Sequence, residues 1–137
     1  KISKEFKKID LILSPAIGGI VIGYEVGRQL SIETIFAERH NGKIQLRRGF
    51  NIPNNINVLI VEDVITTGKS ALECADLVKV ANANIVGYSC IIDRSNKNSL
   101  IKDKIVSQIK HHIETFDKNN LPEDLINTLA IKPGSRI

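Results

Sequence analysis

Short apolar runs and stretches of helical periodicity alternate along the chain. The apolar runs, rich in Ile, Val and Leu, have the length and composition of buried strands. They lie at Asp10–Ser14, Glu33–Ala37, Val58–Val61 and Ile85–Ile92. Two further stretches, Ile20–Leu30 and Ala71–Ala81, carry small or apolar residues every three or four positions. This spacing predicts helices that pack one face against a sheet.

The alternation of these elements predicts the fold class. Strands that alternate with helices are typical of an α/β domain, in which a mainly parallel sheet is flanked by helices. The crossovers between parallel strands are expected to be right-handed. A length of 137 residues fits one compact domain with a core of its own. We therefore expect residues 1–137 to form a single domain.

The polar segment from Glu38 to Asn57 fits neither pattern. A loop of this length inside a compact domain is usually functional or disordered. Within it, Ile44, Leu46 and Phe50 indicate a partly ordered arm or hairpin. We expect residues 38–57 to form a flexible arm beside the functional site.

The pattern weakens after the last clear strand. We expect a polar loop at Ser95–Ser99, a last strand at His112–Phe116 and a last helix at Pro122–Leu129. The stretch Leu100–Gln108 stays ambiguous between helix and strand.

Composition and charge narrow the class of protein. The net charge is +4, but Lys and Arg are scattered without interleaved aromatic residues, which does not favour a nucleic-acid surface. No apolar run is long enough to span a membrane. Cys74 and Cys90 have no CxxC spacing, so we expect buried thiols in a reducing, cytoplasmic compartment. The chain starts at Lys1 and contains no Met, so we expect an upstream segment in the natural protein.

The stretch VLIVEDVITTGKS, residues 58–70, carries the strongest chemical signal. Its last three residues resemble the end of an ATP-binding P-loop, but that motif requires a glycine at position 63, where this chain has Asp63. A carboxylate at that position would lie where the P-loop backbone wraps a phosphate. We therefore reject an ATPase of the P-loop type.

The same stretch predicts a different phosphate site. A Thr-Thr-Gly turn follows the strand and leads into a helix that starts near Lys69. The first N–H groups and the positive dipole end of such a helix favour an anion. The neighbouring Glu62 and Asp63 suit the hydroxyls of a sugar, a divalent cation such as Mg²⁺, or both. In parallel sheets, ligands bind beyond the carboxyl ends of the strands. A phosphorylated ribose that carries a metal-bound pyrophosphate satisfies each of these features.

Residues 58–70 resemble the PRPP-binding signature of type I phosphoribosyltransferases, where PRPP is 5-phosphoribosyl-1-pyrophosphate. Three other stretches agree in order. Ser14–Gly19 resembles the pyrophosphate loop, and Ile92–Arg94 resembles a base-binding Asp-Arg pair. Phe36–Arg39 together with Leu46–Phe50 resembles the arm of one bacterial subgroup. The tail Lys132–Arg136 also resembles the end of that subgroup. The combination is similar to the branch of the family that uses orotate, and it implies a Rossmann-like core.

The resemblance implies an enzyme that transfers the 5-phosphoribosyl group of PRPP to orotate, giving orotidine 5′-monophosphate and pyrophosphate. It implies that Glu62 and Asp63 hold the ribose hydroxyls and help to site Mg²⁺, and that Arg94 pairs with orotate. The residues implied to bind the 5′-phosphate are Thr66, Thr67, Gly68, Lys69 and Ser70. Those implied to bind pyrophosphate through backbone N–H groups are Ala16, Ile17, Gly18 and Gly19.

The resemblance also implies roles for the arm. It would cover the active site of the partner subunit in a homodimer, where Arg39, His40 and Lys43 would neutralise the departing pyrophosphate. The arm of this chain holds one lysine, whereas many members of the family have a longer arm with two.

Members of this family carry an N-terminal hood over the base, and nothing before Asp10 resembles it. We therefore expect these residues to bind PRPP but to turn over orotate poorly. Two alternatives stay open. A purine-type phosphoribosyltransferase often has Asp in place of Thr66 or Thr67. A PRPP-sensing regulator of the same fold would be expected to add a nucleic-acid-binding surface.

Overall fold

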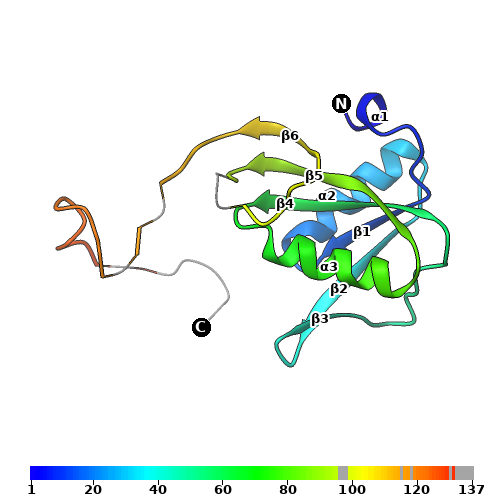
Figure 1. The fold of residues 1–137 in the computed structure, drawn as a ribbon, viewed down its shortest axis with the longest axis horizontal. Helices are drawn as coiled ribbons and strands as arrows, with labels where there is room; N and C mark the ends of the chain where they lie inside the picture. The colour runs from blue at the N-terminus through cyan, green and yellow to red at the C-terminus, as the bar shows by residue number, and fades with distance from the viewer. Residues whose placement is uncertain (96–98, 115, 118, 130, 132–137) are drawn as a thin grey trace.

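A six-stranded sheet forms the body of the protein (Figure 1). The computed structural model describes residues 1–95, 99–114, 116–117, 119–129 and 131. The strand order is β3-β2-β1-β4-β5-β6, and every neighbouring pair is parallel except β2 and β3. The strands are β1 (Leu11–Pro15), β2 (Thr34–His40), β3 (Lys43–Leu46), β4 (Asn57–Ile65), β5 (Asn84–Asp93) and β6 (Ile105–Lys110). The predicted mainly parallel α/β sheet is confirmed.

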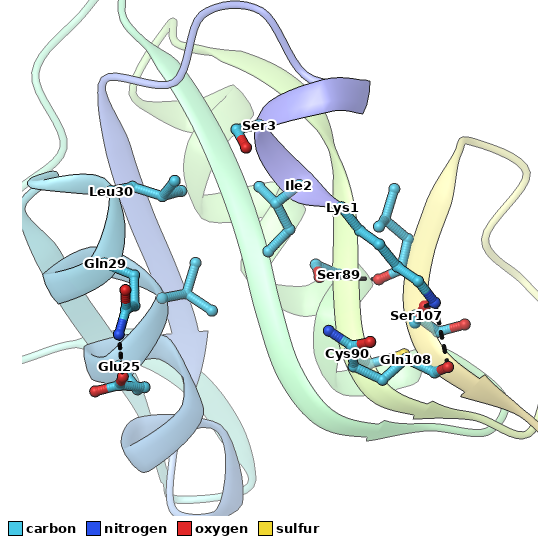
Figure 2. A pocket seen from close by; sticks show the side chains of 12 residues that line it. Lys1, Ile2, Ser3, Glu25, Gln29, Leu30, Ser89, Cys90, Ser107 and Gln108 are labelled. Atoms are coloured by element: carbon cyan, nitrogen blue, oxygen red, sulfur yellow. Dashed lines mark hydrogen bonds between the residues drawn. The ribbon is translucent and has the colours of Figure 1, made fainter.

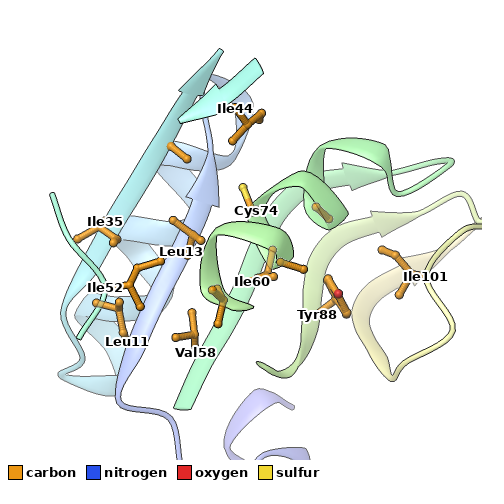
Figure 3. Close-up of a cluster of buried hydrophobic side chains, with 14 of the residues drawn as sticks. Leu11, Leu13, Ile35, Ile44, Ile52, Val58, Ile60, Cys74, Tyr88 and Ile101 are labelled. Carbon is orange, nitrogen blue, oxygen red and sulfur yellow. The ribbon is translucent and has the colours of Figure 1, made fainter. Parts of the chain in front are cut away.

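Two helices cover opposite faces of this sheet, α2 (Gly18–Leu30) and α3 (Lys69–Val80). The central strand β4 shows the division, because successive side chains of a strand point to opposite faces. Val58 and Ile60 pack in the larger core cluster with Cys74 of α3 (Figure 3). Leu59 and Val61 belong to the second cluster, against the α2 side. A short helix, α1 (Ile2–Glu5), precedes β1 and was not predicted.

Helix α2 lies very close to the sheet at Gly23. A β-carbon added at Gly23 would lie 2.0 Å from the hydroxyl oxygen of Ser14 on β1, and both residues are buried. The helical spacing predicted for Ile20–Leu30 is therefore confirmed, and glycine is the residue that this contact requires. The close approach fixes the start of α2 relative to the end of β1.

The first part of the predicted arm is a β-hairpin. Strand β2 continues to His40, and Arg39 pairs antiparallel with Ile44 of β3. Ile44 and Ile52 are both buried in the larger core cluster, which anchors the segment at two points. The expected partly ordered hairpin is confirmed, while movement of residues 38–57 as a flexible arm stays a prediction.

The C-terminal predictions were partly wrong. The ambiguous stretch Leu100–Gln108 contributes strand β6. No strand forms over the described residues of His112–Phe116, and Thr115 lies outside them. Turns replace the expected helix at Pro122–Leu129. The chain here runs away from the sheet (Figure 1), and an isolated helix of this length is marginal in water without a packing surface.

Two other predicted features reach beyond the described residues. The loop Ser95–Ser99 is described only at its two ends, and the tail Lys132–Arg136 lies outside the described part of the chain. Among the described helices, none has the length and hydropathy needed to cross a membrane.

Candidate functional site

The turn between β4 and α3, the corner at residues 66–70, has the features expected of an anion site. Gly68 has a φ of +81°, a left-handed conformation that glycine adopts readily, and α3 starts at the next residue. The first helical hydrogen bond runs from the Leu72 amide to the Gly68 carbonyl at 2.9 Å. The amides before Leu72 therefore have no acceptor within the helix. The Lys69 amide lies 3.4 Å from Thr67 Oγ1, a long contact within the turn itself.

A neighbouring loop holds this turn in place. The Leu100 amide donates to the Thr67 carbonyl at 3.0 Å. The buried Ile101 packs so closely on Gly68 that an added β-carbon would lie 2.6 Å from its side chain. Thr66 and Thr67 remain exposed on the outer side. Leu100 and Ile101 therefore hold the turn on its protein side, while Thr66 and Thr67 face solvent.

Strand β4 runs further toward this corner than the sequence predicted. We expected it to end at Glu62–Asp63, but Val64 and Ile65 still pair with Ile92 and Asp93 of β5. The prediction treated the acids as the end of the strand, whereas pairing with β5 continues past them to Ile65, beyond the last pair with β1 at Ile60.

A second open turn lies at the start of α2. The Ala16 amide donates to the Ala37 carbonyl of β2 at 2.8 Å, and the Ala16–Ile17 peptide bond is cis. Helix α2 begins at Gly18. The first amides of this helix, like those of α3, have no intrahelical acceptor. Ile17 is 80% exposed, so the turn faces solvent.

Asp63 connects the two turns. A β-carbon added at Gly18 would lie 2.3 Å from Asp63 Oδ2, so this carboxylate sits directly against the start of α2. Its other oxygen, Oδ1, accepts a hydrogen bond from the Val64 amide at 2.8 Å, which fixes the orientation of the group. The structure thus places one carboxylate against the start of α2 and shortly before the turn into α3, at the carboxyl ends of neighbouring strands.

Glu62 lies on the other face of the sheet. Its register partner is Cys90 of β5. Burial raises the pKa of Cys90 and of Cys74 on α3, and the nearby Glu62 charge adds to the shift of both thiols. Burial, followed by the nearby Asp63 carboxylate, raises the pKa of Glu62 to about 7. The two acids that the sequence presents as a pair therefore have different surroundings, and only Asp63 contacts the α2 turn.

A cavity of about 760 Å³ opens beside the α2 turn. It is lined by Ala16, Ile17, Gly18, Ile20, Phe36, Glu38, Arg39 and Arg48. The loop implied to bind pyrophosphate thus shares a cavity with Arg39, one of the predicted cations. The corner at 66–70 does not line this cavity, whereas Gly18, which does, lies against Asp63.

The other predicted arm cations lie away from this cavity. His40 and Lys43 face each other in register at the exposed tip of the hairpin. Arg39 pairs with Glu73 of α3 at 2.5 Å and donates to the Gly42 carbonyl at 2.7 Å. The sequence analysis missed Glu38 and Arg48. Beyond Arg39, the polar arm carries Arg47 and Arg48, and this arginine pair was the only signal in the sequence. Strand pairing and a chain reversal bring Glu38 and Arg48 together, and neither can be read from the sequence.

Arg94 directly follows β5, next to the end of β4. Its amide donates to the Ile65 carbonyl at 2.8 Å, and the preceding Asp93 is buried and accepts from the Ser95 amide. Within the part of the chain that the structure describes, the buried Nε atom of Arg94 has no hydrogen-bond partner. A buried guanidinium atom of this kind is suited to an anionic ligand.

A second cavity, of about 290 Å³, lies between α1, α2 and the strands β5 and β6 (Figure 2). Lys1 crosses it and donates to the carbonyls of Ser107 and Gln108 at 2.9 and 3.2 Å. None of the candidate site residues lines this cavity, and we assign no function to it.

Comparison with known proteins identifies the family. The profile of the phosphoribosyl transferase domain matches residues 1–125. This chain belongs to the phosphoribosyltransferase family. It is 45% identical over 128 residues to the orotate phosphoribosyltransferase of Chlorobium phaeobacteroides (strain BS1), covering 93% of this chain and 66% of the relative. It is 43% identical over 136 residues to the enzyme of the same name from Methylorubrum extorquens (strain PA1), covering 98% and 69%.

The resemblance to orotate phosphoribosyltransferases that the sequence predicts is confirmed by these relatives. The chain spans about two thirds of their length. Among solved structures, a purine phosphoribosyltransferase from Pyrococcus horikoshii superposes with a TM-score of 0.65 at 19% identity, covering 81% of this chain and 75% of that one. A likeness at this level of identity concerns the fold, and it confirms the type I phosphoribosyltransferase core.

Proposed function

We propose that this chain transfers the 5-phosphoribosyl group of PRPP to orotate, giving orotidine 5′-monophosphate and pyrophosphate, as a step of pyrimidine nucleotide synthesis. The relatives support orotate as the acceptor, since those that cover nearly all of this chain bear the name of that enzyme. The observation that carries the proposal is the placement of Asp63 between the α2 and α3 turns.

PRPP matches this arrangement because it carries anionic groups at two ends of a ribose. Its 5′-phosphate would bind the corner formed by residues 66–70, through the first amides of α3 and the hydroxyls of Thr66 and Thr67. Its pyrophosphate would bind the first amides of α2. The ribose would then lie against Asp63, whose carboxylate accepts hydrogen bonds from sugar hydroxyls.

The chemistry proposed for this site is displacement at C1 of the ribose. The bond from C1 to the pyrophosphate oxygen breaks with its electron pair, and a ring nitrogen of orotate forms the new bond. Positive charge develops on the ribose as the anion leaves, and Asp63 lies where it would stabilise that charge. The protein otherwise positions the two reactants, and no nucleophilic side chain is needed.

Mg²⁺ is proposed as the cofactor. The described residues contain no group of three or more His, Cys, Asp or Glu side chains that could hold a metal ion. This fits Mg²⁺, which is usually bound by one or two carboxylates together with substrate phosphates and waters. Asp63 would supply a protein oxygen. When bound, the ion would neutralise charge on the leaving pyrophosphate.

Arg94 is proposed to pair with the carboxylate of orotate, for which its planar guanidinium is suited. Its buried Nε atom at the carboxyl end of β5 supports this role. A homodimer in which the arm crosses to the partner subunit, with a catalytic role for Arg39, His40 and Lys43, stays a prediction, as does a cytoplasmic location.

The decisive experiment measures orotate turnover by the full-length protein, followed as loss of orotate absorbance, with and without Mg²⁺. Asp63→Asn should lower kcat/KM by about 100-fold, because a neutral amide no longer stabilises the positive ribose. Asp76→Asn is a matched control, since Asp76 is an exposed carboxylate that pairs with Lys79 on the surface of α3. Turnover of hypoxanthine in place of orotate, or full activity of Asp63→Asn, would contradict the proposal.

A further inference from the structure

The turn after β3 folds back onto β2 at two points. The ring of Phe50 packs edge-on against Phe36, with the ring centroids 5.0 Å apart. Two residues further along β2, Glu38 forms an ion pair with Arg48. Residues 36 and 38 share one face of the strand. The aromatic contact and the ion pair therefore anchor the same turn against the same face.

The ion pair fixes the orientation of the Arg48 guanidinium. Arg48 Nε donates to Glu38 Oε1 in a short contact, and Arg48 Nη2 lies 3.4 Å from Glu38 Oε2. Glu38 thus occupies the Nε–Nη2 edge of the fork. A guanidinium has five N–H donors in one plane, so the Nη1–Nη2 edge remains to bind a second anion.

Arg48 lines the same cavity as the start of α2. Ala16, Ile17 and Gly18, which form the turn implied to bind pyrophosphate, share this cavity with Arg48 and Glu38. The arginine side chain is 64% exposed, while Glu38 is 17% exposed. The largely buried Glu38 therefore holds Arg48 in place, and the exposed Arg48 guanidinium faces the cavity beside the first turn of α2.

Two neighbouring arginines, Arg39 and Arg47, differ from Arg48 in the partner of the guanidinium or in their place relative to the cavity. Arg39 lines the cavity, but its guanidinium pairs with Glu73 and Gly42 on the α3 side. Arg47 lies 3.5 Å from Glu38 through one nitrogen and does not line the cavity. Arg48 alone of these three is held by a carboxylate on the cavity side and also lines the cavity.

We propose that Arg48, oriented by Glu38, binds the pyrophosphate group of PRPP from the same subunit. Arg48 is the contact residue, and Glu38 is a positioning residue that acts through it. The proposal rests on the proposed function for the identity of the anion, and it adds a cation other than Arg39, His40 and Lys43.

The first test measures binding of inorganic pyrophosphate to the full-length protein by calorimetry, with and without Mg²⁺, together with KM for each substrate. Arg48→Gln should weaken pyrophosphate binding and raise KM for PRPP by about tenfold or more, with KM for orotate changed less than twofold, because one charged contact to the anion is lost. Arg48→Lys should restore only part of the binding, since an ammonium lacks the fork.

The matched control is Arg47→Gln, which removes the same charge one residue away and also touches Glu38. It should change pyrophosphate binding less than twofold. Equal effects of Arg47→Gln and Arg48→Gln would overturn the proposal, because they would indicate general charge attraction. Unchanged binding in Arg48→Gln would overturn it as well.

The role of Glu38 is tested by measuring KM for PRPP, which would not change if Glu38 only stabilised the fold. Glu38→Gln should raise KM for PRPP about threefold or more while kcat and the melting temperature stay close to those of the natural protein, since a neutral amide holds the guanidinium less firmly. Glu38→Asp should give an intermediate KM. A fall in kcat or stability without a change in KM for PRPP would refute the positioning role.

These measurements separate this inference from the proposed function. Pyrophosphate binding is measured without orotate, so loss of binding in Arg48→Gln would support the inference even if orotate turnover were absent. Normal orotate turnover with unchanged pyrophosphate binding in Arg48→Gln would reject the inference and leave the proposed function intact.

Discussion

At the scale of single residues, the site depends on the missing side chain at Gly18. This position gives the Asp63 carboxylate room to lie against the first turn of α2, where an added β-carbon would be 2.3 Å from Oδ2. The sequence predicted both residues as site residues, since each lies in a recognisable motif. It did not predict their contact, because that contact depends on β1 and β4 being neighbours in the sheet.

The first prediction concerns Gly18→Ala. The added methyl group must displace the carboxylate of Asp63 or the start of α2, so we expect KM for PRPP to rise and kcat/KM to fall by about 100-fold. Gly18 is exposed, so the melting temperature should change little. The double variant Gly18→Ala/Asp63→Ala should be no worse than Asp63→Ala alone, because both changes act on one contact. Additive losses would show that Gly18 acts in some other way.

The second prediction concerns the pH dependence of stability and Glu62. Burial and the Asp63 carboxylate raise the pKa of Glu62 from 4.5 to about 7 in the folded protein. A raised folded pKa contributes stability that is present below about pH 4.5 and is lost as the pH rises through about 7. In protein free of ligand and metal, Glu62→Gln should therefore melt at nearly the same temperature as the natural protein at about pH 5. It should melt roughly 3–6 °C higher at about pH 8.

The control for this prediction is Glu114→Gln, which changes an exposed carboxylate beyond the end of β6. Its melting temperature should follow that of the natural protein across the same pH range. A difference between Glu62→Gln and the natural protein that is constant with pH would reject the titration of Glu62 as the cause.

At the scale of elements, the sequence predicted the strands and helices in the middle of the chain correctly. It was wrong about where β4 ends and about the elements near the C-terminus. Alternating strands and helices from Asp10 to Ile92 were recovered because their apolar positions have clear periods. Strand β4 was cut short at Glu62, since polar residues resemble a strand end when the neighbouring strands are unknown. The last helix was wrong because periodicity at Pro122–Leu129 says nothing about whether a surface exists for it to cover.

The third prediction concerns the packing of α2 on β1. Alanine has a higher helix propensity than glycine, so Gly23→Ala would stabilise an isolated helix by about 0.5–1 kcal/mol. In this fold the added methyl group would lie 2.0 Å from Ser14 Oγ. We therefore expect the free energy of unfolding to fall by about 1–3 kcal/mol, as measured by urea denaturation. Val21→Ala, on the exposed face of the same helix, should change it by less than about 1 kcal/mol.

At the scale of the whole molecule, the proposed site lies at the carboxyl edge of the sheet. The order of the strands brings two helix starts, one carboxylate and the hairpin to that edge. A sequence motif can predict each turn by itself. It cannot predict the pairing of Glu38 with Arg48, because that pairing requires the hairpin register and a chain reversal with Arg48 in a left-handed conformation, at φ +58°.

The last prediction uses the two buried thiols to report on the entire fold. Burial raises the pKa of Cys74 to about 12 and that of Cys90 to about 11, and both residues are buried members of the larger core cluster. Alkylation at neutral pH requires an accessible thiolate, so both should react only when the structure opens. A ligand that binds only the folded state lowers the open population by the factor 1 + [L]/Kd.

Labelling by iodoacetamide should therefore slow about 100-fold when pyrophosphate with Mg²⁺ is present at about 100 times its Kd, provided that opening is global. The two cysteines should slow by the same factor, because they lie on α3 and β5 in one cluster. Protection of one thiol without the other would show that α3 or β5 opens locally. In Arg48→Gln the same pyrophosphate concentration should protect both thiols less, which connects the proposed contact at the cavity to the stability of the whole molecule.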